Sequence, residues 1–334
     1  MWNTIRCWML FATPFEKGNR LVEQLYLQIN HAVSSDGGED CCALRSYEKG
    51  VFWCVADGCG GLGSRRYASL GNHTGAYAAS RLAARMFAAW TQDNGFPSSA
   101  EEAQLAAHNL CDALTENLAR FARQNCQQEK SRIAGTMQRT LPTTFCAAAC
   151  FENRACFWWA GDSRGYVMDA QGLHQYTRDD VRARTDAFDA LYLDLPLSNL
   201  LSADHAAVMH SRWIQVCQPC VILTATDGVY ACLPTPMEME MLLLDTLRNA
   251  RSMADWNRRL QRQIAANAQD DATLAAVCLC ESFEQLKAVL LSRREQLQSS
   301  MITPVRRKKG NVDFARQKWL LYREGYDRTE EDHA

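Results

Sequence analysis

The stretch from Val51 to Arg66, VFWCVADGCGGLGSRR, constrains the fold of this chain more than any other. It opens with an apolar run over residues 51–56, which is typical of a buried strand. Four glycines follow within residues 58–63, so the backbone there turns sharply or approaches another group closely. An Ala-rich segment over residues 68–90 then predicts a long helix. Asp57 lies where the strand ends, and a carboxylate in that position needs a partner.

Three chemistries are compatible with this stretch taken alone. The Gly-x-Gly-x-x-Gly pattern that begins at Gly58 matches a dinucleotide-binding fingerprint, but no acid follows within residues 64–92 to bind a ribose. Cys59 and Arg65 have the Cys-x5-Arg spacing of a cysteine phosphatase loop, in which a thiolate attacks phosphorus. Asp57 and the next carbonyl are hard oxygen ligands that suit a divalent cation. The rest of the chain decides among the three.

The composition is that of a soluble globular protein, with 47% hydrophobic and 22% charged residues in 334. A net charge of −2 does not favour a nucleic-acid partner. No window holds the ~18 consecutive apolar residues of a membrane span, and the apolar N-terminal patch has no cleavage site. We therefore expect a cytoplasmic protein with no nucleic-acid or membrane partner.

The fifteen cysteines are odd in number, and many lie inside apolar, strand-like runs. Free buried cysteine behaves as a small hydrophobic residue, which is its expected state in a reducing compartment. The single Cys-x-x-Cys, at residues 217–220, is too little for a structural zinc site. Disulfides and zinc are therefore not expected.

Apolar runs bounded by turn residues predict the remaining elements. A capping box at Ser98–Glu102 begins a second helix, whose apolar stripe includes Leu105 and Phe121. A third helix is expected over residues 238–266, and the segment 181–215 has no clear pattern. Strands are predicted within 21–33 and at 41–44, 143–150, 155–160, 165–169, 173–177, 221–226 and 273–280.

Acidic residues recur at the ends of these strands. They lie at positions 39–40, 57, 227 and 270–271, and two of them form Asp-Gly pairs. A single acid at a strand end is commonly a turn former. Four such positions indicate a cluster of oxygen ligands for hard divalent cations.

These residues, in this order, resemble the metal-dependent protein phosphatases of type 2C. The resemblance covers roughly residues 25–281 and implies an α+β fold, an α/β/β/α sandwich of two antiparallel sheets flanked by helices. Each motif is weak alone, and their common order makes the resemblance specific. The motifs are Glu39-Asp40, Asp57–Gly61, Thr143-Thr144, Gly161–Arg164, Thr177–Asp180, Thr226–Gly228 and Asp270–Thr273.

The resemblance also implies the metal ligands. Asp57 corresponds to the acid that bridges two Mn²⁺ or Mg²⁺ ions, and Gly58 to the residue that supplies a backbone carbonyl. The other catalytic carboxylates correspond to Asp40, Asp227 and Asp270. In this family a hydroxide that bridges the two ions attacks phosphorus in line.

Three further acids are weaker candidates. Glu39 lies where the family often has a water-binding acid. Asp162 and Asp180 lie in motifs that shape a third metal region in bacterial members. Asp180 also stands where a histidine is frequent.

The chain departs from the family pattern in two further places. Many members have a phosphate-binding arginine just before the first acid pair, but residues 32–38 contain none. Arg65 and Arg66 are the substitutes that we consider for substrate binding, together with Arg45. Cys59 stands where the animal enzymes have a histidine, and we interpret it as a small residue packed beside the turn.

The sequence thus predicts an irregular N-terminus over residues 1–20 and a phosphatase domain over 21–281. A helical extension over 282–334 contains a basic linker at 306–309. The expected activity is hydrolysis of phosphoserine and phosphothreonine in proteins, with a phosphorylated protein as substrate and a cognate kinase as a further partner. The alternative is a module of the same fold that binds phosphoproteins or a kinase without turnover.

Overall fold

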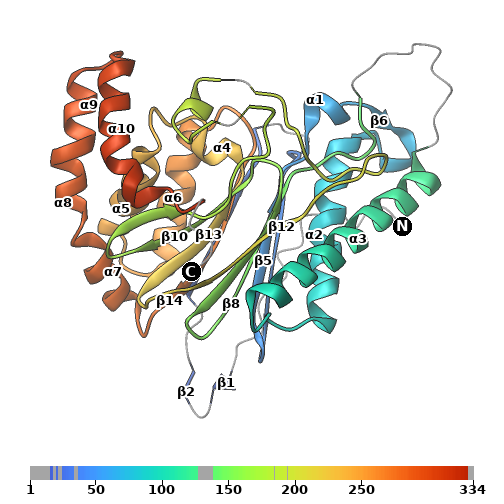
Figure 1. The fold of residues 1–334 in the computed structure, drawn as a ribbon, viewed down its shortest axis with the longest axis horizontal. Coiled ribbons are helices and arrows are strands. Elements are labelled where there is room, and N and C mark those ends of the chain that lie inside the picture. Colours follow the sequence, from blue (N-terminus) through green and yellow to red (C-terminus); the bar gives the residue numbers. More distant parts are fainter. Residues whose placement is uncertain are drawn as a thin grey trace.

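The computed structural model describes residues 16–17, 20–21, 25–33, 37–126, 138–183, 185–193 and 195–329. Two five-stranded antiparallel sheets lie face to face at its centre, and helices cover both outer faces (Figure 1). The expected α/β/β/α sandwich is thereby confirmed. No helix in the described part of the chain is both long and apolar enough to span a bilayer.

The first sheet contains the strand that leads to Asp57 and the glycine-rich turn. Its strands pair in the order β12-β9-β8-β5-β4, all antiparallel. They are β4 (Cys41–Tyr47), β5 (Gly50–Ala56), β8 (Phe145–Phe151), β9 (Arg154–Ala160) and β12 (His210–Gln215).

The second sheet contains the strands that lead to the remaining acids. Its order is β11-β10-β13-β14-β3, again with antiparallel neighbours. They are β3 (Leu25–His31), β10 (Arg164–Asp169), β11 (Gly172–Gln175), β13 (Cys220–Ala225) and β14 (Ala272–Leu279).

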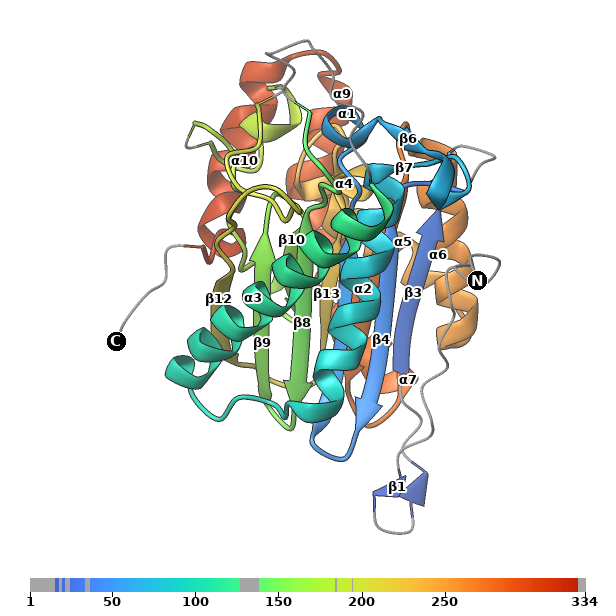
Figure 2. The same ribbon diagram turned by 90° about the vertical axis from the view of Figure 1, so that its right-hand side faces the viewer.

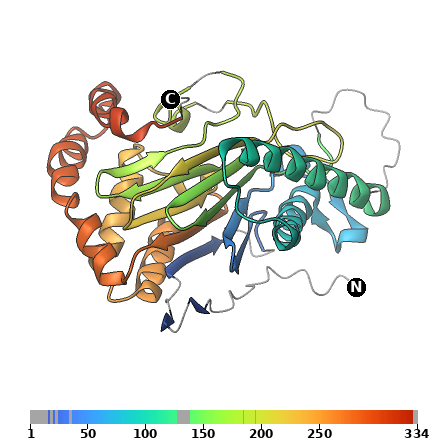
Figure 3. The same ribbon diagram turned by 60° about the horizontal axis from the view of Figure 1, so that its bottom comes forward.

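Three apolar cores hold the layers together. The inner faces of both sheets meet in a core that includes Trp53, Phe157 and Ile222. On the first sheet lie α2 (Gly75–Asp93) and α3 (Ala100–Asn125), and the alanines of α2 allow that helix to approach β4 and β5 closely. The second sheet is covered by α5 (Met237–Arg248), α6 (Met253–Asn267) and α7 (Phe283–Leu291). Figure 3 shows the four layers nearly end on.

The C-terminal extension packs on the second sheet's side of the sandwich. It consists of α7, α8 (Arg294–Leu297), a π-helical segment η3 (Gln298–Ile302), α9 (Thr303–Arg307) and α10 (Val312–Tyr326). Trp319, Tyr322 and Tyr326 of α10 belong to the same apolar core as β10, β13 and β14. The carboxylate of Glu240, fully buried in α5, accepts hydrogen bonds from Arg293 Nε at 2.6 Å and Tyr322 Oη at 2.5 Å.

Short elements complete the chain. Residues 16–17 and 20–21 pair as the strands β1 (Glu16–Lys17) and β2 (Arg20–Leu21), within the segment expected to be irregular. The others are α1 (Gly60–Gly63), β6 (Arg66–Tyr67), η1 (Ala68–Leu70), β7 (His73–Thr74), η2 (Asp189–Leu191) and α4 (Asp227–Tyr230).

Four details of the sequence prediction are wrong. The helix expected from residue 68 begins at Gly75, because β6, η1 and β7 occupy the intervening residues. The helix expected over 238–266 is two helices, the second capped by Ser252, whose side chain accepts a hydrogen bond from Asp255 N. Leu105 is 61% exposed and lies outside the core stripe. The basic run is a linker only at Lys308 and Lys309, because Arg306 and Arg307 lie in α9 and Arg306 forms an ion pair with Glu238.

Candidate active site

Carboxylates from both sheets gather at one end of the sandwich. In Figure 2 this is the upper end, which carries α1 and α4. The acids line a cavity of about 640 Å³. The acidic residues that line this acid cavity are Glu39, Asp57, Asp162, Asp227, Asp270 and Asp271.

Antiparallel pairing explains why the first two acids meet. Cys41, the first residue of β4, pairs with Ala56, the last residue of β5. Asp40 and Asp57 are the next residues outward on each strand, so the register brings them to the same edge. The proximity predicted from their positions one hairpin apart is therefore observed.

Thr226 connects this edge to the second sheet. Its hydroxyl donates to Asp40 Oδ2 at 2.7 Å and accepts from the backbone N–H of Thr273 at 2.9 Å. Thr226 follows β13 and is the N-cap residue of α4, whose first residue is Asp227. One hydroxyl thus ties Asp40 and Asp227 into the same end of the molecule.

The turn after β5 is held from the Thr143-Thr144 motif. The carbonyl of Asp57 accepts from Thr143 Oγ1 at 2.7 Å and from Thr144 N at 2.8 Å. A Cβ atom at Gly58 would lie 2.5 Å from the carbonyl oxygen of Ala76. Only glycine fits there, and it lets α2 pack directly against the turn.

The loop that carries Glu39 is fixed by two residues whose roles the sequence pattern did not reveal. The carboxylate of Asp271 accepts from Val33 N at 2.8 Å and from Glu39 N at 2.5 Å. Arg81 of α2 donates to the carbonyls of Gly37 at 2.8 Å and Gly38 at 3.0 Å. The glutamate side chain then accepts a hydrogen bond from the hydroxyl of Thr74.

A buried ion pair joins the Gly161–Arg164 motif, which contains Asp162, to the Thr177–Asp180 motif. Arg164 donates to Asp179 through Nε at 3.0 Å and Nη2 at 2.7 Å, and its guanidinium lies 3.9 Å from the ring centre of Tyr230 in α4. The hydroxyl of Tyr230 donates to the carbonyl of Asp162 at 2.8 Å. The guanidinium and ring therefore position Asp162 against the helix that begins with Asp227.

Burial and mutual repulsion raise the pKa values of the central carboxyls. Desolvation is the largest cause for each of them. The pKa of Asp40 rises to about 8, with a further contribution from the charge of Asp227. The pKa of Asp162 also rises to about 8, again with help from Asp227. Burial raises the pKa of Asp57 well above its usual range, and the charges of Asp40, Asp227 and Asp162 add to that shift.

This donor set fits a hard divalent cation. Asp40 is 2% exposed, and its Oδ1 has no hydrogen-bond partner in the described part of the chain. An acceptor left unpaired among repelling carboxyls is stabilised by a cation. In the described ranges, however, no three His, Cys, Asp or Glu side chains converge closely enough to complete a coordination shell. The support for a metal site is therefore the chemistry of the donors.

Two predicted ligands lie away from the centre of the cluster. Asp270 is exposed at the cavity rim, where its carboxylate accepts from Asp271 N at 2.8 Å. Asp180 does not line the cavity, and its oxygens accept from Gly161 N at 3.0 Å and Asn199 Nδ2 at 2.7 Å. Its other contact is His210 Nε2 at 2.9 Å. Both remain predictions as metal ligands, and the contacts of Asp180 define a structural role.

The predicted phosphate-binding arginines do not line the acid cavity. Arg65 lies 5.4 Å from the ring centre of Tyr67. Arg66 donates to the carbonyl of Asn72 at 2.9 Å and lines a smaller neighbouring cavity with Glu39. Arg182 does line the acid cavity, from a loop that no periodic pattern revealed.

Cys59 does not have the environment of a cysteine nucleophile. It is the N-cap residue of α1, and its Sγ lies 3.9 Å from the carbonyl oxygen of Asp57. Burial and the charges of Asp57 and Asp162 raise the pKa of its thiol well above the usual range. A reactive cysteine needs a lowered pKa. The packing role expected from the sequence fits this environment.

Solved structures with the same architecture are bacterial phosphatases. Serine/threonine phosphatase Stp1 from Staphylococcus aureus has a TM-score of 0.60 at 15% identity, covering 79% of this chain and 99% of that one. The Mycobacterium tuberculosis serine/threonine phosphatase PstP/Ppp has a TM-score of 0.56 at 18% identity, with 76% and 97% covered. The catalytic domain of PstP in complex with two manganese ions has a TM-score of 0.53 at 16% identity, with 76% and 96% covered. No curated protein sequence matches the chain.

The shared sandwich thus defines the fold class as that of serine/threonine protein phosphatases. The sequence profile of the family Protein phosphatase 2C matches residues 28–278, and the chain belongs to that family. The resemblance that the motifs indicated is confirmed.

Proposed function

We propose that this protein hydrolyses phosphoserine and phosphothreonine in proteins with the help of two Mn²⁺ or Mg²⁺ ions. The observation that carries the proposal is the buried Oδ1 of Asp40, which has no hydrogen-bond partner among the described residues, at the end of the sandwich where Asp57 and Asp227 also lie. The domain that does this chemistry comprises residues 21–281. Its substrates are phosphorylated proteins, and the kinase that phosphorylates them is a further candidate partner.

The cations would be held by Asp57 and the carbonyl of Gly58, with Asp40, Asp227 and Asp270 around them. Glu39 and Asp162, which line the same cavity, are additional candidates for outer positions or a third ion. Bound Mn²⁺ or Mg²⁺ lowers the pKa of water and neutralises phosphoryl oxygens during attack on phosphorus. The raised pKa values of Asp40 and Asp162 mean that these acids must release protons before they bind a cation.

The test is hydrolysis of a phosphothreonine peptide and of p-nitrophenyl phosphate, in Mn²⁺ and in EDTA. We expect turnover only with the metal, because the carboxylates alone supply no nucleophile. Asp57→Asn should lower kcat by at least about 100-fold, since the residue at the centre of the cluster is lost. Cys59→Ser is the matched control and should retain activity.

Two outcomes would contradict this proposal. Activity in EDTA that disappears in Cys59→Ser would establish the cysteine mechanism instead. Absence of turnover with Mn²⁺, with Mg²⁺ and with both substrates would favour a phosphoprotein-binding module without catalysis.

A further inference from the structure

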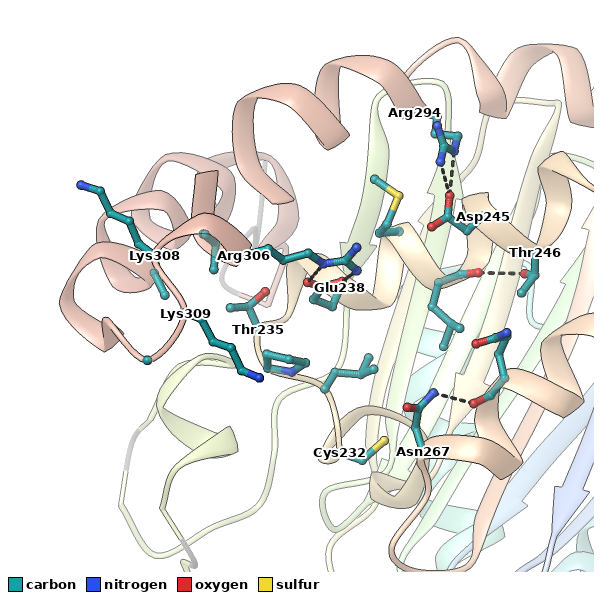
Figure 4. A pocket seen from close by; sticks show the side chains of 18 of the residues that line it. Cys232, Thr235, Glu238, Asp245, Thr246, Asn267, Arg294, Arg306, Lys308 and Lys309 are labelled. Carbon is teal, nitrogen blue, oxygen red and sulfur yellow. Dashed lines mark hydrogen bonds and ion pairs between the residues drawn. The ribbon is translucent and has the colours of Figure 1, made fainter. Parts of the chain in front are cut away.

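A second cavity, of about 1,190 Å³, lies between the C-terminal extension and the helices α5 and α6. Figure 4 shows it from close by, with the turn between α9 and α10 on one side. None of its lining residues lines the acid cavity. Its chemistry therefore requires an explanation other than catalysis.

The lining of this second cavity is strongly basic. Among the described residues that line it, the only acids are Glu238 and Asp245, although the whole chain has a net charge of −2. The side chains therefore concentrate positive charge at one place on the surface, which attracts anionic partners. The basic residues are Arg259, Arg262, Arg294, Arg306, Lys308 and Lys309.

Intramolecular contacts account for four of these six cations. Arg294 and Arg306 pair with the two lining acids, and Arg259 pairs with Asp255 at 3.0 Å. Lys308 Nζ lies 4.0 Å from the ring centre of Phe314. Each of these groups already has a structural partner, so none of them requires a ligand.

Arg262 and Lys309 have no such partner among the described residues. They come from different elements, Arg262 from α6 and Lys309 from the turn between α9 and α10, and both line the cavity. In Figure 4 the side chain of Lys309 extends toward the cavity. Two exposed cations that face one space from two elements can hold acidic groups between them.

Thr235 supplies an independent indication of a ligand. Its side chain is 1% exposed and lines the cavity, yet its Oγ1 has no hydrogen-bond partner within the described ranges. An unpaired buried hydroxyl is destabilising, and a polar group of a ligand would offset that cost. The neighbouring Thr246 differs, because its hydroxyl donates to Leu242 O at 2.8 Å and accepts from Trp256 Nε1 at 3.0 Å.

The remaining lining favours a peptide over a small anion. The volume exceeds the ~300–1,000 Å³ of ordinary small-molecule sites. Side-chain amides and aliphatic residues both contribute to this lining, although Asn249, Asn267 and Asn311 each make one hydrogen bond within the chain. The amides are Asn249, Gln263, Asn267 and Asn311, and the aliphatic residues include Leu233, Pro234, Met241, Leu242 and Val305.

We propose that this cavity binds an acidic peptide segment of a partner protein, with Arg262 and Lys309 contacting its carboxylates and Thr235 contacting its backbone. The site is separate from the phosphatase site, and binding does not require a metal. The free cations give specificity for acidic residues, and the amides and aliphatic residues hold the chain that bears them.

The test measures fluorescence anisotropy of a labelled peptide of Glu-Leu-Asp-Ser repeats with the full-length protein in EDTA. We expect saturable binding that weakens as salt rises, and no binding of the peptide with lysine in place of both acids. Arg262→Glu combined with Lys309→Glu should weaken binding roughly tenfold or more. Arg120→Glu combined with Arg123→Glu, two exposed positions on α3, is the matched control and should bind normally.

A second variant separates binding from folding. Thr235→Val should weaken binding without lowering the melting temperature, because the hydroxyl it removes is unpaired in the free protein. Equal binding by the wild type and the Arg262/Lys309 variant would overturn the proposal. Binding of tripolyphosphate without any binding of the peptide would overturn the proposal in favour of a small-anion site. Because EDTA is present throughout, neither result depends on phosphatase activity.

Discussion

At the scale of single residues, Arg182 is an exposed basic side chain at the acid cavity that the sequence patterns did not reveal. Arg139 also lines this cavity, where it contacts His205. The loop of Arg182 is fixed by a hydrogen bond from Arg182 N to Pro196 O at 3.0 Å and by pairing of Val181 with Leu197. The residue is exposed at the acid cavity, where a substrate phosphate would arrive. It can therefore replace the arginine that is missing from residues 32–38.

We predict that Arg182→Ala raises the KM for a phosphothreonine peptide about tenfold and changes kcat less, because it removes a charge-assisted contact to the substrate. Steady-state kinetics in Mn²⁺ measure both constants. Arg65→Ala and Arg66→Ala are the comparison variants, since sequence reasoning proposed those residues. A larger rise in KM for Arg66→Ala than for Arg182→Ala would restore the original prediction.

The carboxyls of Asp40 and Asp162 make a second prediction at this scale. Their pKa values are about 8 in the folded protein and about 3.9 in an unfolded chain. Between these values the folded state holds more protons, so the metal-free protein must lose stability as pH rises from about 4 to 8. Each group contributes at most about 1.4 kcal/mol per pH unit.

Thermal unfolding in EDTA from pH 5 to pH 8 measures this loss. We expect the melting temperature to fall, Asp40→Asn to reduce the slope, and the exposed control Asp93→Asn to retain it. Mn²⁺ should reverse the fall at pH 8, because the ionised carboxylates then bind the cation. A metal-free melting temperature that rises with pH would contradict the raised pKa values.

At the scale of elements, α10 shows how the extension is attached. Trp319 is fully buried, and its Nε1 donates to Asp186 Oδ2 at 3.0 Å. Arg316 of α10 pairs with Asp189 in η2, so α10 also holds the loop that contains η2. Leu321, on the opposite face, is 62% exposed.

Trp319→Ala should lower the free energy of unfolding by about 3–5 kcal/mol, because it empties a large buried volume and removes the hydrogen bond to Asp186 Oδ2. Leu321→Ala is the matched control and should change stability by less than about 0.5 kcal/mol. Urea denaturation followed by tryptophan fluorescence and by circular dichroism measures both. Similar losses for the two variants would mean that α10 is not docked in this way.

Sequence patterns predicted the elements that bury one continuous apolar face and failed where burial is partial. The strands before Asp57 and Asp227 are apolar throughout, and their final acids could be recognised as a cluster. Strand β12 was missed because it is an edge strand, half-exposed and rich in polar residues. The position of Arg182 depends on how a long irregular loop folds back, which no local period encodes.

At the scale of the whole molecule, the extension is part of the folded unit. Glu240 has no exposed surface, and both partners of its carboxylate, Arg293 and Tyr322, come from the extension. A buried carboxylate without partners costs about 3–5 kcal/mol. The boundary predicted at residue 281 therefore separates motifs rather than independent folding units.

A chain that ends after Glu281 should consequently be much less stable than the full chain, or insoluble. Differential scanning calorimetry should give one transition for the full chain, with the extension unfolding together with the sandwich. Tyr322→Phe removes one hydrogen bond from Glu240, so its melting temperature should lie between those of the full chain and the truncated chain. A truncated chain with an unchanged melting temperature would contradict this account.

The same contact has a consequence for biosynthesis. All strands of both sheets precede residue 281, so the ribosome completes the sandwich before it adds the partners of Glu240. At roughly 5–20 residues per second, the extension is translated over several seconds after the sheets. During that interval the nascent protein carries a carboxylate without its partners and an uncovered apolar face on β10 and β11. The fold is therefore completed only after the acids that line its cavity have been made.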